Sequence, residues 1–133
     1  MMDKYASRRF DIYKEDAIDA SVLETIPFEY PGSGTEVVYS TDEFTAVCPW
    51  TGLPDFARLA ISYVPDNRLV ELKSLKYFLT SFRNVGILQE HAVNRILNDL
   101  VRVVQPLSMT VEADFGERGG LRTRATARFR RDA

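Results

Sequence analysis

The 133-residue sequence contains one cysteine, Cys48, which ends an apolar run and precedes a turn-rich loop. The loop runs through Pro49-Trp50-Thr51-Gly52-Leu53-Pro54 to Asp55, and its prolines and glycine present the thiol from a stiff turn. A thiol with a pKa of about 8.5 is only a few per cent ionised at neutral pH, so a nucleophilic cysteine needs a neighbour that manages its proton. Asp55, across the turn, is a candidate for that role. A buried, inert cysteine and a turn-forming aspartate are the alternatives.

Two lysines form a candidate anion site. Lys73 and Lys76 lie three residues apart in Glu71-Leu72-Lys73-Ser74-Leu75-Lys76, which opens an expected helix. Cations near a helix start oppose the helix dipole, so helix stability does not explain them. They indicate binding of an anion such as a phosphate, and a solvated helix face is the alternative.

Gln89-Glu90-His91 opens a second expected helix. A glutamate held there can accept hydrogen bonds from an amide N–H and an adjacent amino group, the donor pair on the edge of a guanine-like ring. A favourable first-turn acid is the alternative.

His91 is the sole histidine of the sequence, and an ordinary surface residue is its simplest interpretation. Six arginines lie between Arg118 and Arg131, and several of them alternate along the last expected strand. We expect this stripe to meet a phosphate, an acidic neighbour or solvent.

Composition narrows the class of protein. A chain of this length with 45% hydrophobic residues fits one globular domain. One cysteine and one histidine supply neither an internal disulfide nor the ligands of a usual zinc site. The net charge of -2 argues against general nucleic-acid binding. The sequence shows no membrane span or apolar signal region, so we expect no membrane partner and a cytoplasmic protein with a reduced thiol.

The first half of the chain predicts an N-terminal arm and three strands. Residues 1–34 are mixed in character and end in Pro31-Gly32-Ser33-Gly34, which indicates an arm before a catalytic domain at 35–133. Short β-branched and aromatic runs at 35–40 and 44–48 flank Thr41-Asp42-Glu43, which predicts a hairpin. Residues 56–64 alternate with the period of a strand.

The second half predicts two helices followed by two strands. Apolar residues recur at three and four positions in two segments separated by Asn84-Val85-Gly86: Leu72, Leu75, Leu79 and Phe82, then Val93, Ile96, Leu97, Leu100 and Val104. Alternation returns at 107–115 and 121–129 around a turn at 116–120. The predicted fold is an α+β domain with two helices on one face of an antiparallel sheet. Its long sheet edges predict oligomerisation.

Together, these segments resemble the short, single-domain NADPH-dependent 7-cyano-7-deazaguanine reductases of the tunnelling-fold superfamily. The resemblance extends from about Val22 to about Leu121. Any one matching block is weak, whereas Glu-x-Lys-x-x-Lys together with the Cys-to-Asp spacing is highly specific. The matching blocks are Leu23-Glu24-Thr25-Ile26-Pro27, Cys48 to Phe56, Glu71 to Phe78, Ser81-Phe82-Arg83-Asn84, Glu90, and Arg118-Gly119-Gly120.

This resemblance implies an activity and a set of residue roles. Cys48 would attack the nitrile of the free 7-cyano-7-deazaguanine base to give a covalent thioimide, with Asp55 transferring the proton. NADPH would deliver two hydrides to give the 7-aminomethyl product, a step of queuosine tRNA modification. Glu90 would read the pyrimidinone edge. The remaining implied contacts are Val70, Glu71, Leu72 and Gln89 for the base, and Lys73, Lys76 and Arg118 for NADPH.

The resemblance also implies a homo-oligomeric ring with active sites at the subunit interfaces. The chain departs from the family at Gln89, where a histidine or another ring-bearing residue is frequent. Glutamine can form a hydrogen bond but cannot shuttle a proton at neutral pH. His91 lies on the other side of Glu90 and does not inherit that role.

Three other classes of protein compete with the reductase. A related amidinotransferase would add ammonia to the same nitrile within tRNA and is expected to lack Lys73 and Lys76. A zinc cyclohydrolase of the superfamily would need more histidine and cysteine. A non-catalytic purine- or pterin-binding module would need Glu90 but would not need Cys48 and Asp55.

Overall fold

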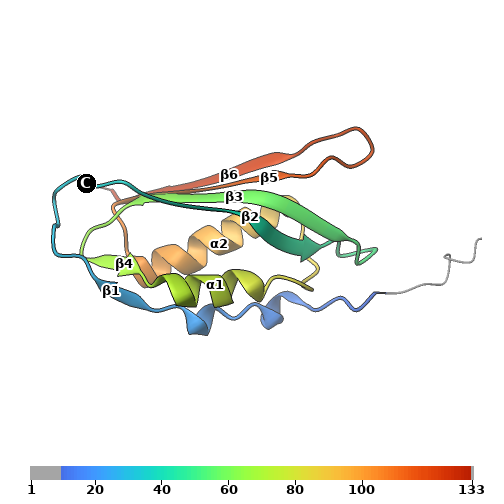
Figure 1. Ribbon diagram of the computed structural model, residues 1–133, viewed down its shortest axis with the longest axis horizontal. Helices are drawn as coiled ribbons and strands as arrows, with labels where there is room; N and C mark the ends of the chain where they lie inside the picture. Colours follow the sequence, from blue (N-terminus) through green and yellow to red (C-terminus); the bar gives the residue numbers. More distant parts are fainter. Residues whose placement is uncertain (1–9, 133) are drawn as a thin grey trace, which may run out of the picture.

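An antiparallel sheet with strand order β2-β3-β5-β6 forms one layer of the domain, and the helices α1 and α2 cover one of its faces (Figure 1). The computed structural model describes residues 10–132, and this part of the chain confirms the predicted α+β architecture. A small second sheet pairs β1 with β4. The elements are η1 (Glu15–Ala17), η2 (Ala20–Val22), β1 (Thr25–Pro27), β2 (Val37–Val47), β3 (Pro54–Val64), β4 (Arg68–Val70), α1 (Leu72–Thr80), α2 (Gln89–Val104), β5 (Ser108–Phe115) and β6 (Arg124–Arg130).

Alternation in the sequence determines which side of the sheet faces the core. In β3 and β5, every second residue is buried beneath the helices. Tyr63, Phe115 and Val111 are each at most 2% exposed, and they pack against buried side chains of α1 and α2 such as Phe78 and Ile96. The opposite face carries polar side chains in register across three strands, such as Arg58, Asp114 and Arg124. That face also exposes the apolar side chains Val38 and Phe56, so it is mixed in character.

The predicted hairpin at 41–43 is wrong, because β2 continues through these residues as one strand. The pairing with β3 shifts by one residue between Thr41 and Phe44, which is a β-bulge. Val37 and Tyr39 turn toward the helix side before the bulge, and Phe44 and Ala46 do so after it. Before the bulge the odd-numbered residues face the helices, and after it the even-numbered residues do. In the sequence, this change in the apolar alternation looks the same as a turn between two strands.

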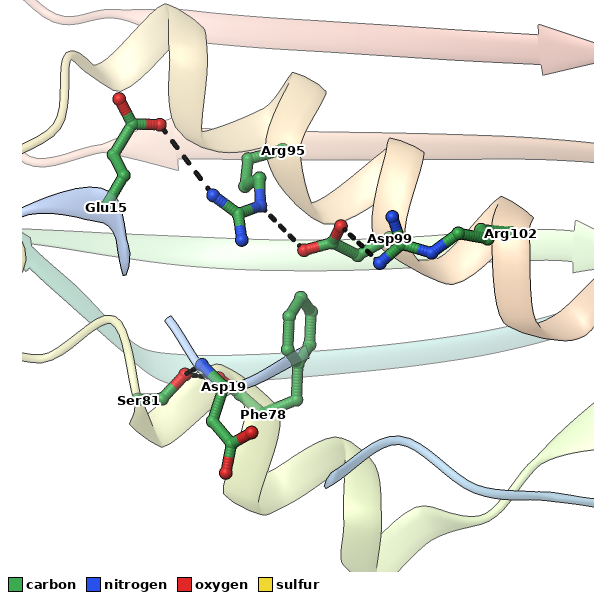
Figure 2. A network of polar contacts seen from close by, with 7 residues as sticks. All are labelled: Glu15, Asp19, Phe78, Ser81, Arg95, Asp99 and Arg102. Carbon is green, nitrogen blue, oxygen red and sulfur yellow. Dashed lines mark hydrogen bonds and ion pairs between the residues drawn. The ribbon is translucent and has the colours of Figure 1, made fainter. Parts of the chain in front are cut away.

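The part of the predicted arm that the structure describes packs against the helices. Ile18 and Leu23 are buried in the core, and β1 pairs with β4. On α2, the buried Asp99 carboxylate receives a 2.7 Å hydrogen bond from Arg95 Nε, and it lies 3.1 Å from Arg102 Nη2 (Figure 2). Arg95 also reaches Glu15 of η1 at 4.0 Å. This polar network connects the N-terminal segment to the helix layer.

Both α-helices begin where the sequence places them. Glu71 is the N-cap of α1, and its carboxylate accepts hydrogen bonds from the backbone N–H groups of Lys73 and Ser74. The helix ends at Thr80, so Phe82 is buried in the turn that follows rather than in the helix. Gln105, in the left-handed conformation, ends α2 before Pro106. Within residues 10–132, no helix is both long enough and apolar enough to cross a membrane.

Candidate active site

Cys48 lies at the mouth of the tight turn that joins β2 to β3. The last strand pair is Val47 with Pro54, and the Cys48 N–H then donates to the Leu53 carbonyl at 2.9 Å. The Gly52 N–H donates back to the Cys48 carbonyl at 2.8 Å. Gly52 adopts a φ of 74°, which lies in the left-handed region where a residue with a side chain is strained. The turn therefore holds the cysteine backbone from both sides.

The same turn stabilises the ionised form of the thiol. Burial raises the pKa of Cys48, but hydrogen bonds from the Thr51 hydroxyl, from the backbone N–H groups of Thr51 and Trp50, and from Arg118 outweigh it and lower the pKa to about 7. The Thr51 oxygen accepts from the Leu53 N–H at 3.2 Å, so its own O–H is free to donate to sulfur. The lowered pKa increases the fraction of Cys48 that is a thiolate at neutral pH, relative to an ordinary thiol.

Asp55 is buried and shares Arg118 with Cys48, and its environment shifts the ionisation of its carboxyl group toward the protonated form. Only 5% of the residue is exposed, and this burial raises the pKa of its carboxyl group, against the lowering effects of the Arg118 charge and of hydrogen bonding from Gln89. Oδ1 lies 3.0 Å from Arg118 Nη1, but the guanidinium N–H is not directed at it, so this buried oxygen has a charge partner and no hydrogen-bond donor. It can therefore hold or deliver a proton.

Arg118 reaches Asp55 from the loop between β5 and β6. Gly119 and Gly120 have φ values of 58° and 81°, and the backbone groups of Arg118 and Leu121 bond to each other in both directions. This tight turn directs the guanidinium toward Asp55. The structure thus pairs the arginine, expected from the resemblance to contact NADPH, with the proposed acid.

The start of α2 completes this end of the domain. The Gln89 side chain reaches Asp55, which the sequence did not indicate. Glu90 and His91 are exposed in the first turn of α2. Cys48, Asp55, Gln89 and Arg118 therefore come together from four segments of the chain.

The other predicted site residues lie at the opposite end of β3. The Val70 N–H donates to the Tyr63 hydroxyl at 3.1 Å, and Tyr63 is eight residues beyond Asp55 along the strand. At about 3.3 Å per residue, roughly 26 Å of strand separates the two positions. Glu71, Leu72, Lys73 and Lys76 follow Val70 directly at the start of α1. Figure 1 shows the β2–β3 turn and the start of α1 at opposite ends of the sheet.

A groove of about 860 Å³ runs between α1 and the β2 side of the sheet. Leu72, Leu75 and Leu79 contribute apolar walls, whereas Lys76 and Arg83 contribute positive charge. Cys48 and Asp55 do not line it. Neither Lys73 nor Lys76 forms an ion pair among residues 10–132, so both ammonium groups are available to an anion.

One contributor to the site, Thr51, was missed as a functional residue from the sequence. Its position three residues after Cys48 within a glycine-containing turn is the signal that can identify it. A hydroxyl at that spacing faces back toward the first residue of the turn.

Three relatives found by comparison with known proteins share one name. The family model described as QueF-like protein matches residues 54–133. A protein of Caldicellulosiruptor bescii named NADPH-dependent 7-cyano-7-deazaguanine reductase is 63% identical, covering 97% of this chain and 98% of that protein. Proteins of the same name from Caldanaerobacter subterraneus subsp. tengcongensis and Thermoanaerobacter pseudethanolicus are 61% and 59% identical, each covering 99% of this chain and 98% and 99% of their own lengths.

The fold also has a solved counterpart. The apo crystal structure of the archaeosine synthase QueF-Like superposes with a TM-score of 0.66, covering 72% of this chain and 94% of that chain at 22% identity. At that identity, the likeness concerns the fold alone.

Proposed function

This chain belongs to the QueF-like family, and we propose that it reduces the nitrile of 7-cyano-7-deazaguanine to the 7-aminomethyl group with NADPH. The family relationship to reductases of that name supports the substrate and the cofactor. The observation that carries the chemistry is a thiol with a pKa of about 7 beside a buried carboxyl group whose pKa is raised. Such a pair combines a nucleophile with a proton donor.

We propose that Cys48 begins the reaction as a thiolate. Its sulfur bonds to the nitrile carbon while one electron pair of the C≡N bond moves to nitrogen. That nitrogen takes the proton of Asp55, which leaves a neutral thioimide and a carboxylate. The positive charge of Arg118, 3.0 Å from Asp55 Oδ1, then stabilises the carboxylate. Gln89 orients the same carboxyl group through its amide.

NADPH, when bound, supplies the two hydrides that convert the nitrile carbon to an amine carbon. Lys73 and Lys76 are the residues we propose to bind its phosphates, because they are exposed, lack ion-pair partners among the described residues and stand beside a groove with apolar walls. Glu90, with Val70, Glu71 and Leu72, is proposed to bind the base.

The separation of these residues supports a site shared between subunits. A single base cannot contact both ends of β3 across roughly 26 Å of strand. We therefore propose that the Cys48 end of one subunit faces the Val70–Lys76 segment of another in a homo-oligomeric ring. The outer strands β2 and β6 each have one edge without a partner in the described chain, and such edges favour pairing with a further strand.

The proposed function is tested by incubating the protein with the cyano base and NADPH. We expect loss of cofactor absorbance in proportion to amine formed, at two hydrides for each nitrile. Without NADPH, intact-mass measurement should show the base bound to wild type and not to Cys48→Ala. Normal turnover by Cys48→Ala would contradict covalent catalysis. Amidine formation with ammonium and no NADPH oxidation would identify an amidinotransferase instead.

A further inference from the structure

The N-terminal segment Phe10–Tyr13 lies against the turn that carries Cys48. The Tyr13 N–H donates to the Asn84 carbonyl at 2.8 Å, and the Gly86 N–H donates to the Tyr13 carbonyl at 2.9 Å. This is a parallel β-bridge between Tyr13 and Val85. The first described residues of the chain are therefore fixed to the segment that joins α1 and α2.

The other edge of that segment is bonded to the residue before the nucleophile. The Val47 N–H donates to the Val85 carbonyl at 3.0 Å, and the Ile87 N–H donates to the Val47 carbonyl at 3.2 Å. The segment 84–87 thus lies between Tyr13 on one side and Val47 on the other. Two sets of backbone hydrogen bonds therefore connect Tyr13 to Val47, the residue before Cys48.

Side-chain packing makes a second, direct connection through Ile12. A Cβ on Gly86 would lie 2.5 Å from Ile12 Cγ2 and 3.0 Å from Pro49 Cα. A Cβ on Gly52 would lie 3.1 Å from Ile12 Cγ1 and 2.8 Å from Phe10 Cβ. Gly86 has no positive φ, so backbone strain does not explain a glycine there, whereas the approach of Ile12 and Pro49 does. Ile12, which is 37% exposed, therefore packs one side of its side chain against both glycines.

We infer that Ile12 is a positioning residue for the nucleophile, acting by packing against Gly52 and Gly86 to hold the Pro49–Gly52 turn in place. The turn supplies the Trp50 and Thr51 groups that hydrogen-bond to the Cys48 sulfur, so a loosened turn would hold the thiolate less well. A β-branched side chain suits this role because it has few rotamers. The inference deepens the proposed function and relies on it for the catalytic consequence.

The test uses alkylation, because the chain has only one cysteine and iodoacetamide therefore reports on Cys48 alone. In Ile12→Ala, we expect the pH midpoint of the alkylation rate to rise above about 7. We also expect kcat to fall roughly tenfold while KM for NADPH stays unchanged, since small misplacements of a reacting group are costly. Ile12→Val keeps both γ-carbons and should retain the wild-type midpoint.

Gly86→Ala provides a second disturbance of the same contact and keeps the inference testable if Ile12→Ala does not fold. We expect it to raise the midpoint in the wild-type background and to have a smaller effect in an Ile12→Ala background, where Cγ2 is gone. Ile26→Ala, an exposed isoleucine of β1, is the matched control and should leave the midpoint unchanged.

Two outcomes separate the inference from the proposed function. A wild-type midpoint and kcat in both Ile12→Ala and Gly86→Ala would overturn the positioning role, even if wild type reduces the nitrile. A raised midpoint in a protein that does not reduce the nitrile would instead refute the proposed function and leave the packing role of Ile12 standing.

Discussion

At the scale of single residues, the acidity of Cys48, the proposed nucleophile, depends on hydrogen bonds from its own turn and from Arg118. Cys48 is 8% exposed, and burial alone would raise its pKa. The Thr51 hydroxyl is the largest of the contributions that lower it, ahead of the two backbone N–H groups and Arg118. A turn of this kind directs several donors at one atom, which stabilises an anion.

Replacing Thr51 with valine should therefore move the ionisation of Cys48 upward. We expect the alkylation midpoint to rise from about 7 toward that of an ordinary thiol, so that the rate at pH 7 falls while the rates converge at a pH where both thiols are fully ionised. Thr51→Ser retains the hydroxyl and should behave like wild type. An unchanged midpoint in Thr51→Val would contradict the assignment of that hydrogen bond.

The two lysines of α1 allow a prediction about cofactor binding. Changing both Lys73 and Lys76 to alanine should raise KM for NADPH at least about tenfold, because two charge-assisted contacts to phosphate are lost. Formation of the Cys48 adduct without NADPH should stay nearly intact. Lys14→Ala, a change to another exposed lysine, is the control. Unchanged NADPH dependence of the double variant would indicate a solvated helix face.

At the scale of elements, α2 serves both the site and the anchoring of the N-terminal segment. Its first turn carries Gln89 to Asp55, and its middle carries Asp99, which is 3% exposed. Figure 2 shows Asp99 between Arg95 and Arg102, with Glu15 on the far side of Arg95. The first turn of α2 thus contacts Asp55, and its middle contacts the N-terminal segment through Arg95 and Glu15.

Removing the central carboxylate should destabilise the domain. In Asp99→Ala, Arg95 loses its 2.7 Å partner while its side chain is only 29% exposed, so we expect a loss of about 1–3 kcal/mol in the free energy of unfolding. Glu15→Ala removes only a 4.0 Å contact to a half-exposed carboxylate and should cost less than about 0.5 kcal/mol. Urea unfolding of both variants measures the difference. Equal losses would contradict this ranking.

At the scale of the whole molecule, the proposed site residues form two groups. The Cys48 end also carries Asp55, Gln89, Glu90 and Arg118, and the end of β4 with the start of α1 carries the others. Because β3 holds the two groups apart, a complete site needs residues of more than one subunit if all the proposed roles are correct.

Mixed oligomers test this division. We expect activity to recover when Cys48→Ala subunits are mixed with Lys73→Ala/Lys76→Ala subunits by dissociation and reassembly, although each variant alone is inactive or weak. About a quarter of randomly paired sites would then combine an intact Cys48 end from one subunit with an intact α1 start from another. Cys48→Ala mixed with Glu90→Ala is the matched control and should stay inactive, since both changes fall at the same end. Recovery in both mixtures, or in neither when light scattering shows mixed oligomers, would contradict the division. A monomer with full specific activity would refute the oligomer.

The sequence by itself determined the elements whose patterns are local. Alternation in 56–64 and 107–115 predicted β3 and β5, and three-and-four spacing predicted α1 and α2, because these periods follow from the backbone geometry of each element alone. The Glu-x-Lys-x-x-Lys block and the Cys-to-Asp spacing identified the family, which the relatives confirm.

Only the tertiary structure decided how distant residues meet. The bulge at 41–43 could not be separated from a turn, because both change the parity of an apolar pattern and only the pairing with β3 distinguishes them. Likewise, the contacts of Arg118 and Gln89 with Asp55, and of Ile12 with Gly86, join segments far apart in the chain. No local pattern encodes such contacts, since they arise when helices and loops pack around the end of the sheet.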